Sequence, residues 1–333
     1  MIALVTGSTG FVGGAICRKL VREGYKVRAF HRESSRTLLL DNLPPHSMEH
    51  CIGDITRPET LKPALRDVEI VFHAAAQLGK PYIPEKIYTA TVQGTRNLLQ
   101  AAGEAGVKRV VHTSSVAALG VPEDWNGNGS PPLLDENHTW NYKPQDYPYG
   151  YSKYLAEMEV QRAVAQGLDV VIVNPGVVLG AGDINRVGGS ILLHMSRGHI
   201  PVSIQAGLNA VHIDDVVCGH LAALEKGKTG ERYILGGENL TVTEFLEIIG
   251  KSVGRRTPKF ILPAWAGRML SRPIGMFGDL VGIPINRELL LMAGKYFFYD
   301  MRKARNELGL NEPRPVFDAA REAIDWYRAQ EAC

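Results

Sequence analysis

Along its first half, the chain alternates short apolar runs with longer segments in which apolar residues recur at helical spacing. The strands predicted from the runs cover residues 2–6, 26–31, 49–52, 70–73, 109–114 and 170–174. The helices predicted from the spacing cover residues 11–23, 58–65, 83–105 and 148–166. Continuous apolar strands are typical of parallel sheets covered on both faces. The pattern therefore predicts an α/β fold with a Rossmann-type, doubly wound parallel sheet.

Glycine and proline support these boundaries. Gly24 and Gly106 stand where a helix commonly ends, and Pro58 and Pro148 suit a first helical turn. After residue 174 the alternation becomes irregular, but residues 214–226 and 232–235 predict one more helix and strand of the same sheet. We expect a dinucleotide-binding domain of residues 1–174 and 211–236, and a smaller, mostly helical substrate lobe of residues 175–210 and 237–333.

The composition and cysteine spacing argue against several classes of protein. The chain has 333 residues, of which 45% are hydrophobic and 22% charged, and its net charge of +2 gives no argument for binding nucleic acid or an anionic membrane. Its four cysteines share no short spacing, which argues against a disulfide scaffold or a cysteine-based zinc site and predicts reduced thiols. We expect a cytoplasmic protein that holds no metal.

No leader pattern follows Met1, and the apolar segment 260–284 is interrupted by prolines and charged residues, so we expect no membrane span. This segment has two interpretations. It is either a helix that covers the substrate pocket or an amphipathic helix that rests on a membrane.

A glycine-rich turn joins the first predicted strand to the first helix, where residues 6–13 read Thr-Gly-Ser-Thr-Gly-Phe-Val-Gly. Gly7 suits a tight turn, Gly10 leaves room for a pyrophosphate, and Gly13 lets the helix pack close to the sheet. The free N–H groups of the helix start would hold the phosphates. The turn therefore predicts dinucleotide binding, with a purely structural glycine turn as the alternative.

The residue at the end of the second strand indicates which dinucleotide binds. An acidic residue there accepts from a ribose 2′-hydroxyl, but this chain has Arg32, which suits the 2′-phosphate of NADP. The adjacent Glu33 would favour NAD instead, and both could be solvated loop charges. We predict NADP, with NAD as the alternative. Asp54 is expected either to accept from the adenine amino group or to cap the following segment.

Tyr149 and Lys153 are four residues apart at the start of a predicted helix and therefore share one face. A phenol has a pKa of about 10, so it needs a neighbouring ammonium to act as an acid or base near neutral pH. A second pair with this spacing, Tyr82 and Lys86, contains Pro84 and cannot lie within a helix. We predict that Tyr149 and Lys153 are catalytic, and a surface pair is the alternative.

Hydroxyl side chains follow the fifth predicted strand, where parallel strands present their ends to the ligand crevice. We choose Ser115 to bind the substrate oxygen, with Ser114 as the second candidate and a capping cluster as the alternative. The small side chains that end the fourth strand would let the nicotinamide half lie against the backbone, although core packing explains them equally well. These are Ala74, Ala75 and Ala76.

Other side chains have two interpretations each. The long loop 119–147 is expected to be a lid or binding loop, and its aromatic side chains either stack on a substrate ring or anchor the loop. These are Trp125, Trp140, Tyr142 and Tyr147. His212 could touch substrate, but His194, His199 and His220 have no ligand spacing. Arg186, Arg197 and Arg232 either meet a substrate pyrophosphate or are solvated charges.

Together these motifs resemble the extended short-chain dehydrogenases/reductases of the NAD-dependent epimerase/dehydratase group. The resemblance runs from residue 2 to about residue 239, and it is carried by TGSTGFVG (6–13), Asp54, HAAA (73–76), VQGTRNLL (92–99), TSS (113–115), YGYSK (149–153), NPGVVLG (174–180) and VHIDDVV (211–217). It implies that Ser115, Tyr149 and Lys153 form a catalytic triad and that the cofactor lies across the carboxyl-terminal edge of the sheet. The implied cofactor contacts are Gly7, Thr9, Gly10, Phe11, Val12, Gly13, Arg32, Asp54, Ile55, Ala74, Ala75, Ala76, Thr113, Tyr149, Lys153, Pro175, Val177 and Val178.

Within the group, the chain is most similar to dihydroflavonol-4-reductase-like members and to sugar epimerases associated with hopanoid pathways. It departs from the group in three places. Thr91 replaces a common Asn, Asn174 replaces the Arg of many sugar-nucleotide enzymes, and no acidic residue follows Thr113, which disfavours dehydration of a sugar nucleotide.

We therefore expect an NADP-dependent oxidoreductase that reduces a ketone or aldehyde, or oxidises the alcohol. The alternatives are a nucleotide-sugar epimerase with tightly bound cofactor and a regulator that senses NADP without turnover. The partner is expected to be a small carbonyl, alcohol or sugar-nucleotide substrate. The resemblance also implies a homodimer formed through helices 83–105 and 148–166.

Overall fold

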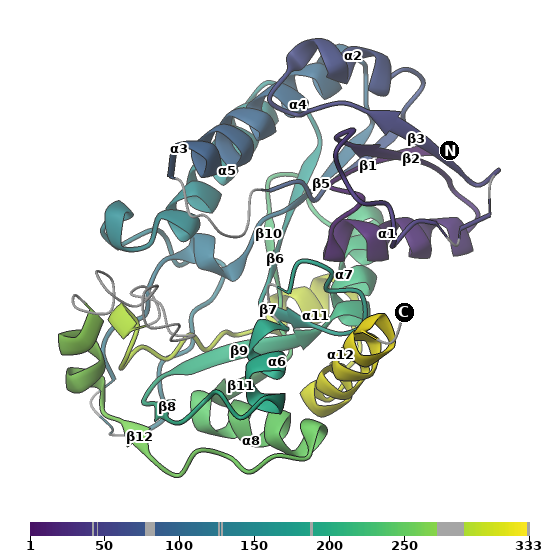
Figure 1. Ribbon diagram of the computed structural model, residues 1–333. Helices are drawn as coiled ribbons and strands as arrows, with labels where there is room; N and C mark the ends of the chain where they lie inside the picture. The colour runs from purple at the N-terminus through teal and green to yellow at the C-terminus, as the bar shows by residue number, and fades with distance from the viewer. Residues whose placement is uncertain are drawn as a thin grey trace.

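The computed structural model describes residues 1–41, 43–44, 46–76, 84–125, 127, 129–186, 189–271 and 290–331. A seven-stranded parallel sheet forms the upper part of the molecule in Figure 1. Its strand order is β10-β6-β5-β4-β1-β2-β3. The strands are β1 (Ile2–Thr6), β2 (Lys26–His31), β3 (Met48–Ile52), β4 (Ile70–His73), β5 (Arg109–Thr113), β6 (Val170–Pro175) and β10 (Arg232–Leu235).

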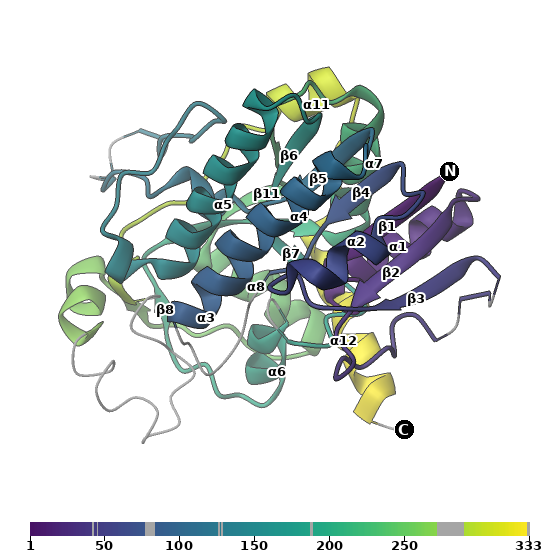
Figure 2. The ribbon, with the colours of Figure 1, turned by 90° about the horizontal axis from the view of Figure 1, so that it is seen from above.

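Helices cover both faces of this sheet, because successive residues of each strand point to opposite sides. On one face, Ala3 and Val5 join a core with side chains of α1 (Phe11–Arg22), α7 (Ile213–Lys226) and α11 (Arg302–Leu308). On the other face, Leu4 joins side chains of α2 (Leu61–Ala64), α4 (Gly94–Glu104) and α5 (Pro148–Ala165). Figure 2 shows α4 and α5 lying side by side along that face. The predicted doubly wound sheet is confirmed.

The predicted strands agree with the observed ones to within one residue at each end. Gly24 and Gly106 follow their helices with φ of +80° and +71°, which explains why glycine stands there. The predicted helix 58–65 is a short 3-10 turn, Pro58–Thr60, that continues into α2.

The helix predicted over residues 83–105 is not continuous. It consists of α3 (Pro84–Tyr88), a π-helical turn η2 (Thr89–Gln93) and α4, and its predicted first residue lies outside the described residues. Gly94 explains the close approach of α4 to the loop after β3, because a Cβ at this position would lie 2.6 Å from Cδ1 of Ile55. The spacing of apolar residues could not predict the π turn, because such a turn shifts the helical repeat by only one residue.

The lower part of Figure 1 holds a three-stranded sheet of order β11-β9-β7 and a two-stranded sheet of β12 and β8. Their strands are β7 (Val177–Leu179), β8 (Ser203–Ile204), β9 (Gly207–His212), β11 (Glu238–Thr241) and β12 (Ile261–Leu262). Side chains of α6 (Ser190–Ser196), α8 (Val242–Val253) and α12 (Val316–Glu331) form one core with β7 and β9. The lobe predicted to be mostly helical therefore also contains two small sheets, and where the domain boundary falls stays a prediction.

In the described part of the chain, no helix combines the length and apolarity that a membrane crossing needs.

Candidate active site

The glycine turn between β1 and α1 is folded against the end of β4. Gly7 has φ of +67°, and a Cβ there would lie 2.8 Å from the carbonyl oxygen of Ala74 and 2.7 Å from the amide nitrogen of Ala75. A Cβ on Gly13 would overlap the carbonyl oxygen of Gly7. Any side chain at these positions would open the turn, so both glycines are required by close backbone contact.

The first turn of α1 is built to receive an anion. Gly10 is the N-cap residue in an extended conformation, and no side chain caps the helix. The first N–H groups of the helix therefore remain available, and the helix dipole favours negative charge at this end. Thr9, Phe11 and Val12 are half-buried around the turn. The residues present fit the pyrophosphate of a dinucleotide, as the sequence predicts.

A buried hydrogen-bond chain fixes the end of β4 beside this turn. The Thr95 hydroxyl donates to the Thr91 carbonyl at 2.6 Å, so it accepts from Nε2–H of His73 at 2.9 Å. Nδ1 of His73 therefore accepts from the Thr6 hydroxyl at 2.7 Å. Burial, and then the charge of Lys153, lower the pKa of His73 to about 3, which keeps the ring neutral. The neutral imidazole is a structural tie between β1, β4 and α4.

Ala74, Ala75 and Ala76 continue from this tie and are half-buried, which leaves backbone next to the glycine turn. The backbone N–H of Ala75 donates to the Thr6 hydroxyl at 3.3 Å, so the first alanines of the segment are held in place. The structure therefore brings the predicted pyrophosphate and nicotinamide segments side by side.

The residues predicted to meet the adenosine end lie at the ends of β2 and β3. Arg32 is exposed, and within the described residues no carboxylate pairs with it. Asp54 accepts from the N–H of Thr56 at 2.9 Å and from its hydroxyl at 2.8 Å, both through Oδ1. Asp54 therefore closes a local turn and does not cap the following 3-10 helix Pro58–Thr60, whose N-cap is Arg57; its Oδ2 has no partner in the described part of the chain. Ile55 is buried beside it.

Lys153 lies on α5 and reaches the end of β5, where its ammonium donates to the carbonyl oxygen of Thr113 at 2.9 Å. Its side chain is almost completely buried. Burial lowers the pKa of Lys153 to about 8, and the carboxylate of Glu157 opposes that fall. An ammonium is therefore still present at neutral pH, and it lies in surroundings where its electrostatic effect is strong.

Tyr149 and Ser115 lie close to this ammonium in the fold. Tyr149 is the second residue of α5, one turn before Lys153, and it is half-buried. Ser115 is the N-cap of the short helix η3 (Val116–Leu119), which packs against α5. Its hydroxyl accepts from the N–H of Ala117 at 3.2 Å, so its proton can point elsewhere. The structure thus places the three predicted residues on neighbouring elements, α5 and η3, beside the carboxyl end of β5, and their catalytic roles stay a prediction.

A buried carboxylate that the sequence analysis missed lies one turn beyond Lys153. Glu157 accepts from the Ser114 hydroxyl at 2.5 Å, from Nδ2 of Asn174 at 2.7 Å and from Arg232 at 3.3 Å. Burial raises the pKa of Glu157, and these donors oppose the rise because each one stabilises the charged form. The sequence could have indicated Glu157 through its spacing, because it follows Lys153 by four residues and therefore lies on the same face of the helix.

This network also engages two of the candidate residues. Ser114, the second candidate for the substrate oxygen, is buried and donates to Glu157. Arg232 is not a solvated charge, because its guanidinium pairs with Glu157 and donates to the carbonyl of His138 at 3.4 Å. Asn174 also donates to the carbonyl of Ser115 at 2.9 Å, so this amide fixes the backbone of the predicted oxygen-binding residue.

Replacing Glu157 with Gln should lower the pKa of Lys153 further below 8, because the amide keeps the shape of the carboxylate but removes the charge that supports the ammonium. The titration of Lys153 can be followed by NMR of the protein labelled with ¹³C at lysine Cε. The matched control is Glu159→Gln on the same helix, whose carboxylate pairs with Arg96 and Arg162 instead. An unchanged Lys153 titration in the Glu157 variant would show that the two groups are uncoupled.

The remaining predicted residues are placed as follows. Pro175 ends β6, and Val177 and Val178 begin β7, where they are half-buried.

His212 caps α7 by accepting from the N–H of Asp214 at 3.0 Å, and its Nε2 lies 3.1 Å from Glu322. Both ring nitrogens are therefore engaged in structural contacts. Arg186 is exposed with a left-handed backbone, at φ of +53°.

The aromatic residues of the long loop anchor it. Trp140 donates from Nε1 to the carbonyl of Tyr142 at 2.7 Å and stacks on Tyr154 of α5, with ring centroids 6.1 Å apart. Trp125 meets Tyr296 edge-on, with ring centroids 5.0 Å apart. Tyr147 contacts both Trp140 and Phe297. The anchoring interpretation thus has direct support from these ring contacts.

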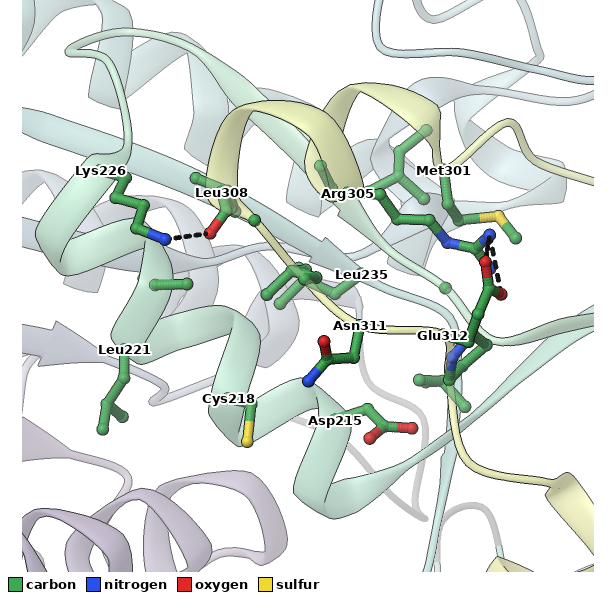
Figure 3. Close-up of a pocket in the computed structure, with 18 of the residues that line it drawn as sticks. Asp215, Cys218, Leu221, Lys226, Leu235, Met301, Arg305, Leu308, Asn311 and Glu312 are labelled. Carbon is green, nitrogen blue, oxygen red and sulfur yellow. Dashed lines mark hydrogen bonds and ion pairs between the residues drawn. The ribbon is translucent and has the colours of Figure 1, made fainter.

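A cavity of about 600 Å³ lies away from all predicted site residues, between α1, α7 and α11 (Figure 3). Several of its charged groups are engaged within its own wall. Lys226 donates to the carbonyl of Leu308 at 3.1 Å, and Arg305 pairs with Glu312 at 3.0 Å, as the dashed lines show. We therefore assign no ligand to it.

Within the described residues, no group of three or more His, Cys, Asp or Glu side chains could hold a metal ion.

Comparison with known proteins agrees with this geometry. The NAD dependent epimerase/dehydratase family matches residues 3–236, more than two thirds of the chain. The chain belongs to this family. Members of the family are NAD(P)-dependent reductases, epimerases and dehydratases.

Two curated relatives span nearly the whole chain. A putative dihydroflavonol 4-reductase of Synechocystis sp. is 36% identical and is matched over 97% of this chain and 94% of its own. Sterol demethylase protein B of Methylococcus capsulatus is 32% identical, with 98% of each chain covered. Among solved structures, a nucleoside-diphosphate-sugar epimerase from Pseudomonas aeruginosa is 26% identical and superposes with a TM-score of 0.80 over 99% of this chain and 98% of its own.

Proposed function

We propose that this member of the family is an NADP-dependent oxidoreductase that reduces a ketone or aldehyde to the alcohol. The observation that carries the proposal is the buried ammonium of Lys153 on the carbonyl of Thr113, one helical turn from Tyr149 and close to Ser115. Burial lowers the pKa of this ammonium to about 8, so it stays charged at neutral pH and favours the phenolate form of a nearby phenol.

In the proposed reaction, Ser115 donates a hydrogen bond to the carbonyl oxygen of the substrate and polarises the bond. When bound, the reduced nicotinamide supplies the hydride, with its electron pair, to the carbonyl carbon. Tyr149 gives its phenolic proton to the oxygen as the alkoxide develops, and Lys153 stabilises the resulting phenolate. Asn174 does not touch the substrate in this scheme. It is a positioning residue, because its amide donates to the carbonyl of Ser115 and fixes that backbone.

The names of the relatives favour a bulky, largely apolar ring compound as substrate. One is named for a dihydroflavonol and the other for a sterol, and both match the chain almost from end to end. Tyr147, two residues before Tyr149, contacts Trp140 and Phe297, so aromatic side chains at the start of α5 would give such a ring a partly aromatic wall.

Cofactor preference is proposed from Arg32, which is exposed at the end of β2. Replacing Arg32 with Ala should weaken NADPH binding roughly 10–100-fold and NADH binding far less, because a charge-assisted hydrogen bond to the 2′-phosphate is lost. Fluorescence titration with each cofactor measures the two constants. Arg22→Ala, at the far end of α1, is the control. Equal losses for both cofactors would mean that Arg32 does not contact the 2′-phosphate.

A nucleotide-sugar epimerase is the second candidate, favoured by the structural similarity to the Pseudomonas aeruginosa epimerase. Two residues argue against it. Asn174 stands where an arginine is common in sugar-nucleotide enzymes, and the nearby cation Arg232 is already paired with Glu157. A pyrophosphate in this position would lack its charge partners.

Absorbance at 340 nm tests the proposal. A reductase should consume NADPH in proportion to product when it is given a panel of aromatic and polycyclic ketones. An epimerase would leave the absorbance unchanged while it interconverts sugar nucleotides. A protein that binds NADPH but turns over neither panel would be a sensor, and the proposal would be wrong.

A further inference from the structure

A strongly basic segment exposes large apolar side chains on the lobe far from the cofactor turn. Residues 248–271 contain no Asp or Glu and five cations, namely Lys251, Arg255, Arg256, Lys259 and Arg268. Five large apolar side chains of the same segment are exposed. They are Phe260 at 60%, Ile261 at 47%, Trp265 at 66%, Met269 at 71% and Leu270 at 42%. We call these ten residues the basic apolar surface.

The backbone below this surface is held in place. Residues 264–271 are helical, and a Cβ on Gly267 would lie 2.8 Å from the Cβ of Ala293, so this side of the helix packs closely against a buried segment. Arg268 pairs with Asp124 at 2.9 Å, and Lys295 pairs with the same carboxylate at 3.1 Å. Trp265, Met269 and Leu270 are therefore exposed on a packed helix, with Trp265 and Met269 one turn apart, while Phe260 and Ile261 lie before it at β12.

Three of the five cations of this segment have no acidic partner among the described residues. Arg268 has Asp124, and Arg255 donates to the carbonyl of Ser196 at 3.0 Å. Within the described part of the chain, no carboxylate pairs with Lys251, Arg256 or Lys259. The net charge of the whole protein is only +2, so this run of cations without an acidic residue is a local excess of positive charge along one segment.

We propose that the basic apolar surface docks onto an anionic lipid bilayer. Exposed Trp, Phe and Met side chains enter the boundary between headgroups and acyl chains, where an indole is particularly favourable. The surrounding Lys and Arg side chains reach the lipid phosphates. Charge complementarity selects the lipid surface, since a protein partner would have to supply carboxylates together with an apolar groove of matching shape.

This docking is peripheral. The eight described helical residues, 264–271, are too few to span a bilayer, so the proposal places them on its surface. Docking does not depend on the proposed reaction, because none of the ten residues belongs to the site around Lys153. The test is therefore a binding measurement that needs no substrate.

Vesicle co-sedimentation tests the proposal with the full chain. Wild-type protein should sediment with vesicles of phosphatidylcholine mixed with phosphatidylglycerol, and at least roughly tenfold less with phosphatidylcholine alone. Trp265→Ser/Met269→Ser should weaken binding to the mixed vesicles roughly tenfold or more, because the buried apolar area is lost. Arg256→Glu/Lys259→Glu should remove the preference for the anionic lipid.

The matched control is Leu38→Ser/Ile52→Ser, which removes two other exposed apolar side chains, at 44% and 54%. Ile52 ends β3, which lies across the molecule from β12 in Figure 1. This variant should bind vesicles like the wild type. The proposal is overturned if the wild type does not sediment, or if the Trp265/Met269 variant binds as the wild type does. It is also overturned if that variant instead converts a dimer into a monomer, because the surface would then join two copies of the chain.

Discussion

Replacing Tyr149 with Phe should lower kcat by roughly 10²–10⁴-fold, because the substrate oxygen loses its proton donor in the transition state. NADPH binding should be almost unchanged, since the ring of Tyr149 remains and the ammonium of Lys153 still donates to the Thr113 carbonyl. Steady-state kinetics with any ketone that supports NADPH consumption gives kcat, and fluorescence titration gives the cofactor Kd.

The matched control is Tyr154→Phe, on the same helix and one turn further along. The ring of Tyr154 stacks on Trp140, and this contact survives loss of the hydroxyl. The control should therefore keep wild-type kcat. A Tyr149→Phe variant with normal turnover would reject the assignment of the proton donor.

Replacing Lys153 with Met should produce a protein that is more stable but inactive at neutral pH. Burial lowers the pKa of Lys153 from 10.5 to about 8, so holding the ammonium in the folded state costs about 3 kcal/mol below pH 8. Methionine removes this cost and also the hydrogen bond to Thr113, which is worth about 1 kcal/mol. The buried carboxylate of Glu157 also loses a nearby positive charge, so a net gain of about 1 kcal/mol in the free energy of unfolding is expected at pH 7.

The gain should depend on pH in a defined direction. The folded-state pKa lies below the unfolded one, so the cost is fully present below pH 8 and disappears as the pH rises from about 8 toward 10.5. Urea unfolding at pH 7 and pH 10 measures the difference. Exposed Lys143→Met should change stability at neither pH. A Lys153→Met variant that is destabilised at pH 7, or one that retains turnover, would show that the ammonium has a structural role instead.

Features that depend on residues close together in the sequence, such as strands, tight turns and helix faces, were predictable from the sequence. The apolar strands of the large sheet bury side chains on both faces and therefore appear as uninterrupted runs. Gly7 and Gly13 were identified from their spacing in the glycine-rich turn, and the structure adds the backbone contacts that leave no room for a side chain there. Lys153 was identified because a helix places residues i and i+4 on one face, and the same rule pointed to Tyr149.

Features that depend on distant partners were not predictable. Glu157 and Arg232 are 75 residues apart, and their pairing requires that β10 join the sheet beside β6. For the same reason Arg232 was considered as a free cation. His73 is fixed by Thr6 and Thr95, which come from different elements, so its neutral tautomer follows only from the folded arrangement. The short strands β8 and β12 contain two residues each, too few to give a periodic pattern.

The most direct test of the central claim follows the fate of the hydride. NADPH carrying deuterium at C4 of the nicotinamide, on the face that is transferred, is incubated with the protein and a ketone substrate, and the alcohol is analysed by mass spectrometry. The account predicts one deuterium on the carbinol carbon of the product and an equal amount of oxidised cofactor. Recovery of the deuterated NADPH intact, whichever carbonyl compound is supplied, would contradict it.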